Sequence, residues 1–203
     1  MHAFAEVLRV KDCTIFDLLH QSFEERDFIF FTRLAAHLGK LMGCTDQDAV
    51  DFGKLSELLY LSSLLHVSLS EETETMDALR AEKQMPVLLG DLLYGKFISW
   101  LADCGKVQCL PTYLIYLRQF NINGVDGLEG RKIVNLDTAV QLLTEKTAEA
   151  MANFTNFDKL VAIDEAKAYW SAQWDALKGE KVDTFVELEA LLQREFGQGA
   201  KVC

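Results

Sequence analysis

Proline, glycine and basic residues are scarce in this 203-residue chain. It holds only two prolines and twelve glycines, so few residues interrupt long helices. Twenty Lys and Arg residues stand against 31 Asp and Glu residues, which gives a net charge of −11. Nucleic acids and anionic membrane surfaces attract basic proteins, so this charge balance argues against both as partners.

Long apolar runs are missing as well. No stretch approaches the ~20 apolar residues of a membrane span, and residues 6–17 mix charged and apolar side chains instead of forming a signal peptide. We therefore expect no transmembrane segment and a cytoplasmic location. The five cysteines, an odd number, predict reduced thiols. A zinc role for Cys104 and Cys109 is disfavoured because no second pair completes the site.

The apolar residues recur at helical spacing along nearly the whole chain. Half of the residues are hydrophobic, which suits one domain over 1–203. No strand pair or hairpin signal appears, so we predict an all-α fold of about eight helices. The expected helices span 3–22, 27–42, 45–66, 86–102, 111–120, 135–151, 157–177 and 183–196. The helix over 45–66 is apolar around most of its circumference from Leu55 to Leu65, which predicts a buried central helix. We expect the leucines at 58, 61 and 65 of this helix, and those at 89 and 92 of the helix over 86–102, to be buried.

Capping and breaking residues set the expected boundaries. Thr45 or Asp46 would cap one helix, and Asn135 or Asp137 another. Pro86 is expected to open a helix, because proline fits the first helical turn. Residues 68–83 are polar and acidic and predict a loop or a short exposed helix. Three glycines over 121–131 predict a second loop.

Two blocks of sequence carry the strongest functional signal. Residues 62–66 read Ser-Ser-Leu-Leu-His, and residues 86–93 read Pro-Val-Leu-Leu-Gly-Asp-Leu-Leu. In this order they resemble the trans-polyprenyl diphosphate synthases, in which Ser-Leu-Leu-His precedes an Asp-Asp-x-x-Asp motif that binds magnesium and the allylic diphosphate. The resemblance implies an isoprenoid-synthase-like helical bundle, here truncated at the C-terminus.

The metal ligands of that family are missing from this chain. The positions after His66 read Val-Ser-Leu-Ser-Glu, and residues 185–190, where a second aspartate cluster is expected, hold no paired aspartates. Diphosphate departure needs magnesium ions that carboxylates hold in place. We therefore expect the chain to bind no metal or other cofactor, to be inactive alone, and to leave Mg²⁺ to a catalytic partner.

The family also contains heterodimers in which a small subunit lacks both aspartate motifs. The chain resembles that subunit, component I of hexaprenyl or heptaprenyl diphosphate synthase, which serves menaquinone biosynthesis. The resemblance implies a non-catalytic subunit that controls product length. Ser62 and Ser63 match positions that line the tunnel of the growing prenyl chain, and Tyr60 and Phe97 are further candidates for its wall.

A later motif of the family also has a counterpart. Lys146 and Thr147 match a Lys-Thr pair that contacts diphosphate in active enzymes, and they are candidates for a residual contact. Each candidate has a simpler interpretation: Tyr60 and Phe97 as ordinary core residues, and Lys146 as a solvated lysine on a helix.

Other functions remain open at this point. The main alternative is a helical protein-interaction module descended from a prenyltransferase but without a prenyl role. A self-sufficient enzyme with an unfamiliar site is a third possibility. The apolar residues of 55–65 and 86–102 predict that the chain buries surface against a partner. That partner would be the catalytic subunit or, when the chain is alone, a second copy in a homodimer.

Overall fold

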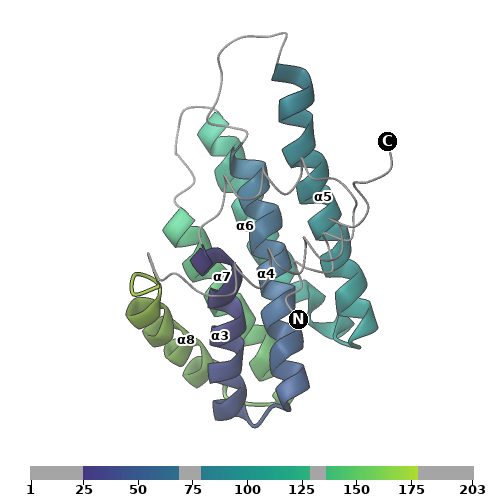
Figure 1. The fold of residues 1–203 in the computed structure, drawn as a ribbon. Coiled ribbons are helices and arrows are strands. Elements are labelled where there is room, and N and C mark those ends of the chain that lie inside the picture. Colours follow the sequence, from purple (N-terminus) through teal and green to yellow (C-terminus); the bar gives the residue numbers. More distant parts are fainter. Residues whose placement is uncertain (1–24, 69–78, 129–135, 178–203) are drawn as a thin grey trace, which may run out of the picture.

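The computed structural model describes residues 25–68, 79–128 and 136–177. Every regular element in these ranges is a helix. The helices are α3 (Glu25–Met42), α4 (Asp46–Ser68), α5 (Leu79–Asp103), α6 (Leu110–Leu128), α7 (Leu136–Thr155) and α8 (Lys159–Gln173), with a 3-10 helix η1 at Val107–Cys109 (Figure 1). The all-α prediction is confirmed over these ranges, which contain no strand. The helices expected over 3–22 and 183–196 lie outside the described residues.

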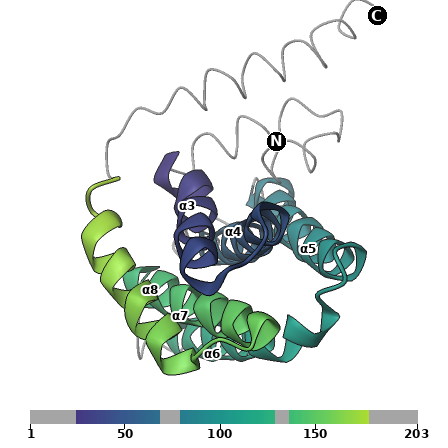
Figure 2. The ribbon, with the colours of Figure 1, turned by 90° about the horizontal axis from the view of Figure 1, so that it is seen from below.

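The helices form two layers of three. Seen along the bundle, α3, α4 and α5 lie side by side, and α8, α7 and α6 run next to them (Figure 2). Contacts of α4 and α3 with α7, and of α4 with α6, join the layers. No helix in the described ranges is both long enough and apolar enough to cross a bilayer.

The turn between α3 and α4 forms where the sequence indicates. Gly43 has φ +67°, a left-handed conformation that glycine adopts without strain at a helix C-terminus. The Thr45 hydroxyl accepts a hydrogen bond from the Asp48 backbone N–H at 3.1 Å. Thr45 is therefore the residue that caps α4, because its side chain satisfies a free N–H of the first turn.

The predicted start of α5 at Pro86 is wrong, because the helix begins at Leu79. Of the loop or short exposed helix expected over 68–83, residues 79–83 are helical, but they belong to the long α5 and not to a separate short helix. The segment from Leu79 to Met85 reads Leu-Arg-Ala-Glu-Lys-Gln-Met, a run of strong helix formers. Their propensity outweighs the single backbone hydrogen bond that Pro86 removes. Residues 69–78 lie outside the described ranges.

Three other boundaries were also wrong. α6 continues past Phe120 to Leu128 and includes two glycines of the predicted loop. Each glycine costs about 1 kcal/mol relative to alanine. The apolar residues that recur at helical spacing in this segment offset that cost. α7 ends at Thr155, beyond the predicted end near residue 151, and Asn156 follows it with φ 57°. α8 begins only at Lys159, because the Asp158 carboxylate accepts hydrogen bonds from the Leu160 and Val161 N–H groups and caps it there.

The central position of α4 is confirmed. Every residue from Asp51 to Ser63 is buried, and Leu58 and Leu61 are among them as predicted. Leu92, which the sequence predicts to be buried, is only half-buried. It lies beside the inner face of α5, which Leu93, Phe97 and Leu101 form at four-residue spacing.

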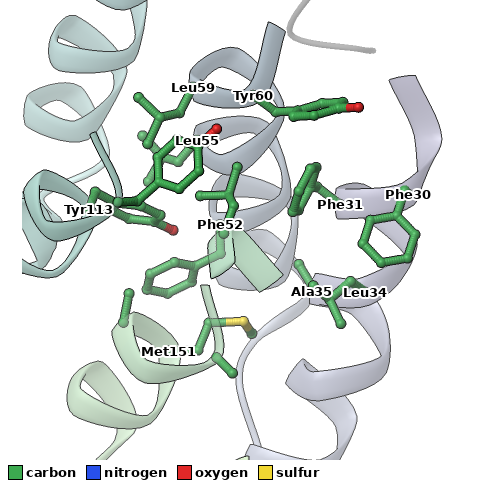
Figure 3. Close-up of a cluster of buried hydrophobic side chains, with 14 of the residues drawn as sticks. Phe30, Phe31, Leu34, Ala35, Phe52, Leu55, Leu59, Tyr60, Tyr113 and Met151 are labelled. Carbon is green, nitrogen blue, oxygen red and sulfur yellow. The ribbon is translucent and has the colours of Figure 1, made fainter. Parts of the chain in front are cut away.

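Aromatic rings fill the space on both sides of α4. Figure 3 shows Phe31 and Tyr60 on the side of α3 and Tyr113 on the opposite side. The Phe31 and Tyr60 rings lie 5.4 Å apart, and Phe52 meets Phe154 of α7 at 5.6 Å. These contacts pack α4 against α3 within its own layer and against α7 of the other layer.

Candidate functional site

The two sequence blocks that carry the family resemblance meet at the contact between α4 and α5. The Ser62 hydroxyl donates a hydrogen bond to the Gly90 carbonyl at 2.8 Å. One turn further along α4, His66 Nδ1 donates to the Ser62 carbonyl at 2.8 Å, and His66 Nε2 lies 3.4 Å from an Asp91 carboxylate oxygen. A Cβ at Gly90 would lie 2.7 Å from His66 Cε1, so glycine permits this approach.

Ser63 points in a different direction from Ser62. Neighbouring residues on a helix point about 100° apart. The Ser63 hydroxyl donates to the Leu59 carbonyl of its own helix at 2.9 Å. Burial raises the pKa of the Tyr116 phenol on α6, and the Ser63 hydroxyl opposes that rise. Ser63 therefore faces α6, whereas Ser62 faces α5.

Further hydroxyl groups line the same interior space. Ser56 Oγ lies 2.7 Å from Thr147 Oγ1 and 3.2 Å from the Tyr113 phenol oxygen. Thr147 in turn donates to the Leu143 carbonyl at 2.8 Å. Burial raises the pKa of Tyr113, and a hydrogen bond with Ser56 opposes the rise. Helices α4, α6 and α7 are thus joined by a buried chain of hydrogen bonds.

Tyr116 and Thr144 are both fully buried, and neither hydroxyl makes a well-aligned hydrogen bond, although the Ser63 hydroxyl lies close enough to Tyr116 to oppose the rise of its pKa. We call the whole group the interior hydroxyl cluster. Its members are Ser56, Ser63, Tyr113, Tyr116 and Thr147. Both phenols have raised pKa values and remain neutral at physiological pH. The cluster is therefore suited to exchanging hydrogen bonds with a neutral group and not to acid–base catalysis.

The predicted tunnel residues divide between the two sides of α4. Phe97 of α5 contacts Tyr113 at 5.5 Å between ring centroids and so borders the interior hydroxyl cluster, as does Ser63. Tyr60 points away from the cluster, toward Phe31 and toward Trp174 at 6.4 Å. Ser63 and Phe97 thus both lie against α6, whereas Ser62 faces α5 and Tyr60 faces α3.

Lys146 and Thr147 also lie on different sides of their helix. Thr147 is buried within the interior hydroxyl cluster, whereas the Lys146 ammonium pairs with Glu149 at 2.7 Å. Lys159 of α8 pairs with the same carboxylate. Burial acts to raise the pKa of Glu149, but the hydrogen bonds from the two lysines prevail and lower it. The two predicted diphosphate contacts are therefore engaged within the protein, each with a different partner.

A buried lysine is the main feature that the sequence did not reveal. Lys106 is 2% exposed, and its ammonium donates to Asp48 at 2.8 Å and to Asp51 at 3.0 Å. The Phe52 and Phe154 rings lie 5.5 and 4.9 Å from it. Burial acts to lower the pKa of Lys106, yet the hydrogen bonds with both aspartates raise it, and the pKa of Asp48 is lowered in return. The three residues form a charged link between the start of α4 and the turn that follows α5.

Three thiols lie near this link. Cys44, Cys104 and Cys109 are free, which agrees with the prediction of reduced thiols; Cys13 and Cys203 lie outside the described residues. Burial raises the pKa of each thiol, to about 11 for Cys109, although Lys106 opposes the rise. Protonated thiols are poor nucleophiles and poor metal ligands, so these cysteines serve as small packing residues.

A second buried ionisable group on α4 is Glu57, which lies near Thr32 of α3. Glu57 is 1% exposed, and burial raises the pKa of its carboxyl group to about 8. One of its oxygens lies 3.4 Å from the Thr32 hydroxyl, and the other has no partner. The ammonium of Lys54 lies 4.0 Å above the Trp100 ring. Glu57 is therefore held mainly in its neutral form at pH 7.

Comparison with protein-family models, with curated proteins and with solved structures finds no match to this chain. Among the described residues, no group of three or more His, Cys, Asp or Glu side chains is arranged to hold a metal ion. The functional interpretation rests on the two sequence blocks and on the geometry of the interior around α4.

Proposed function

We propose that the chain is the non-catalytic subunit of a heterodimeric long-chain trans-polyprenyl diphosphate synthase, in which it controls product length. Its partner supplies the aspartate motifs and the Mg²⁺ ions. The chain works in the cytoplasm, and the product becomes the side chain of menaquinone. The observation that carries the proposal is the contact between Ser62 and Gly90. It joins the two sequence blocks that resemble the family into one packed unit.

The surface for a partner lies away from the middle of α4. The sequence predicts that the apolar residues of 55–65 contact a partner. Residues 51–63 are already buried within the chain, so the predicted surface is covered as far as residue 63. α5 has one buried face and an exposed one, on which Ile98 lies. The catalytic subunit, or a second copy in a homodimer, would contact such outward faces.

Within the heterodimer, Ser63 is the residue that we expect to influence product length. It faces Tyr116 of α6, and Phe97 contacts Tyr113 of the same helix. A prenyl tail that passes this point needs room, because a packed interior yields little to an inserted methyl group. Ser62 faces α5 and makes a hydrogen bond there, so we expect it to support packing alone.

The test uses the two serines as a matched pair. The chain is co-expressed with an aspartate-rich prenyltransferase from the same organism, and dephosphorylated products are separated by chromatography. Ser63→Val should shorten the products, whereas Ser62→Val, the same substitution one residue earlier, should leave their length unchanged. Co-purification and circular dichroism verify that both complexes are assembled and folded.

Three outcomes would contradict the proposal. If the purified chain condenses allylic and homoallylic diphosphates on its own, it is a catalyst. If the complex forms but product length is the same with and without the chain, the protein-interaction module is the better description. If both serine variants change the length of the prenyl product equally, the change comes from altered packing and not from the direction of the Ser63 side chain.

A further inference from the structure

Lys54 and Glu57 lie one turn apart on the same side of α4. Residues three apart on a helix are neighbours, and these two side chains are buried, with exposed fractions of 9% and 1%. Among the residues that the structure describes, no carboxylate lies within ion-pair distance of the Lys54 ammonium, and one Glu57 oxygen has no hydrogen-bond partner. A buried lysine and a buried acid are thus neighbours that do not form an ion pair.

The two side chains instead contact different neighbouring helices. Lys54 Nζ lies 4.0 Å from the centroid of the Trp100 ring on α5, where the electron-rich face of the indole attracts a cation. Glu57 Oε2 lies 3.4 Å from the Thr32 hydroxyl, which donates to it from α3. Lys54 therefore connects α4 to α5, whereas Glu57 connects α4 to α3.

This arrangement requires a proton on Glu57, because a buried carboxylate without a cation is costly. Burial raises the pKa of Glu57 to about 8, and this rise is opposed by the hydrogen bond from Thr32 and by the charges of Lys54 and the N-terminal amino group. No group of α5, α6 or α7 in the described ranges contributes to that pKa. Asp51, earlier on α4, is paired with Lys106. When the proton leaves, Glu57 therefore needs a cation that is close and not already paired.

Lys54 is such a cation. It lies one turn away, it has no carboxylate partner in the described part of the chain, and its four-carbon side chain is flexible. We propose that Lys54 is a two-position switch: its ammonium lies over the Trp100 ring while Glu57 is protonated, and it moves to the Glu57 carboxylate when that proton passes to solvent. One proton thus shifts a contact of α4 away from α5. The switch does not depend on the prenyltransferase proposal.

The Trp100 ring can report where Lys54 lies. The full chain is labelled with 5-fluorotryptophan, and ¹⁹F NMR spectra are recorded while the pH is raised from about 6 to about 10. The chain has three tryptophans, at positions 100, 170 and 174, and Trp100→Phe assigns the resonance of interest. That resonance should move with a midpoint near pH 8, the pKa of Glu57. The resonances of Trp170 and Trp174, which belong to α8 and its end, are the internal controls and should stay in place.

Three variants separate a moving lysine from other causes. Glu57→Gln cannot ionise, so the Trp100 resonance should keep its low-pH position throughout. Lys54→Met removes the cation, so the resonance should not move with pH, whereas Lys54→Arg keeps a positive charge and should restore the movement. If the wild-type resonance stays constant through pH 8, or if it moves equally in Lys54→Met, then Lys54 does not change position and the proposal is wrong.

The titration of Glu57 gives a second measurement that does not depend on tryptophan. Glutamate is labelled with ¹³C at its carboxyl carbon, and Glu57→Gln assigns the Glu57 signal. Lys54→Met should raise the midpoint by about one pH unit or more, a tenfold weaker release of the proton, because the ionised form loses its cation. Lys54→Arg should titrate close to the wild type. An unchanged midpoint in Lys54→Met overturns the proposal.

Comparing the wild type with Glu57→Gln keeps the test decisive even if a lysine variant does not fold. Circular dichroism follows the helical signal of both proteins over the same pH range. Both should stay helical while only the wild type shows the movement of the Trp100 resonance. If the wild type loses its helical signal as Glu57 ionises and Glu57→Gln does not, the ionised carboxylate has found no cation and the switch does not exist.

Discussion

The Ser62 hydroxyl donates to the Gly90 carbonyl across 2.8 Å, and His66 from the next turn lies above the same glycine. Two α-helices approach this closely only where one of them lacks a side chain. The contact explains why a glycine, which is unfavourable in a helix interior, occurs in the middle of α5.

Gly90→Ala is therefore expected to stabilise the chain less than an alanine elsewhere on α5, because its Cβ would meet the His66 ring, which must turn aside and give up its hydrogen bond to Ser62. Gly95→Ala on the same helix is the control. A Cβ there meets no atom within 4 Å, so the better helix propensity of alanine should stabilise the chain by about 0.5–1 kcal/mol. Denaturant unfolding measures both changes, and equal effects of the two substitutions would show that the close contact does not form.

Lys106→Met should cost roughly 3–5 kcal/mol in the free energy of unfolding. The substitution leaves the buried Asp51 carboxylate without its cation, and an uncompensated buried charge is costly. Lys159→Met is the matched control, because that lysine is 48% exposed and Glu149 keeps Lys146 as a partner. Exposed pairs contribute about 0–1 kcal/mol. Similar losses for both lysines would mean that Lys106 is solvated.

Glu57 should make stability depend on pH. Its pKa is about 8 in the folded chain against 4.5 in the reference state, so the unfolded chain releases this proton at lower pH. Stability from this group is present below pH 4.5 and is lost as pH rises toward 8, by up to roughly 4–5 kcal/mol.

Glu57→Gln isolates that effect, because glutamine resembles the neutral acid and does not ionise. The variant should unfold with nearly the wild-type free energy at acidic pH and be clearly more stable than the wild type at pH 8. Glu165→Gln is the control, because its half-exposed carboxylate pairs with His37 near the surface. Parallel stability profiles of the wild type and Glu57→Gln would show that Glu57 is ionised in the folded chain.

Leu61→Ala should destabilise the chain by about 2–5 kcal/mol, since it creates a cavity in the fully buried centre of α4. Leu160→Ala on α8 removes the same atoms from a residue that is 74% exposed and should change stability by less than about 0.5 kcal/mol. Thermal and denaturant unfolding compare the two variants directly. A small loss at Leu61 would contradict the central position of α4.

Local patterns in the sequence predicted the helices and the role of α4, because both depend on periodicity. The Gly43 turn and the Thr45 cap could also be predicted, because each depends on the conformational or hydrogen-bonding preference of a single residue. Pro86 and the glycines at 124 and 127 misled the prediction, because helix formers and apolar spacing around them outweigh a single breaker.

The site depends on contacts that sequence order does not show. Lys106 meets Asp48 and Asp51 across more than fifty residues, and Ser56 meets Thr147 across 91. The sequence identified Ser62 and Ser63 as a pair. Only the packing of α5 and α6 around α4 shows that the two serines serve different neighbours.

The enclosure of α4 also determines how the protein opens. Residues 51–63 are all buried, so local fraying of helix ends does not expose their backbone amides to solvent. Their hydrogens should exchange with deuterium only when the whole bundle unfolds. The amide hydrogens near Leu160 should exchange through local opening of the first turn of α8. The slowest-exchanging amides of the chain would then lie on the helix that carries both serines, and its interior would be the last part to admit a ligand from solution.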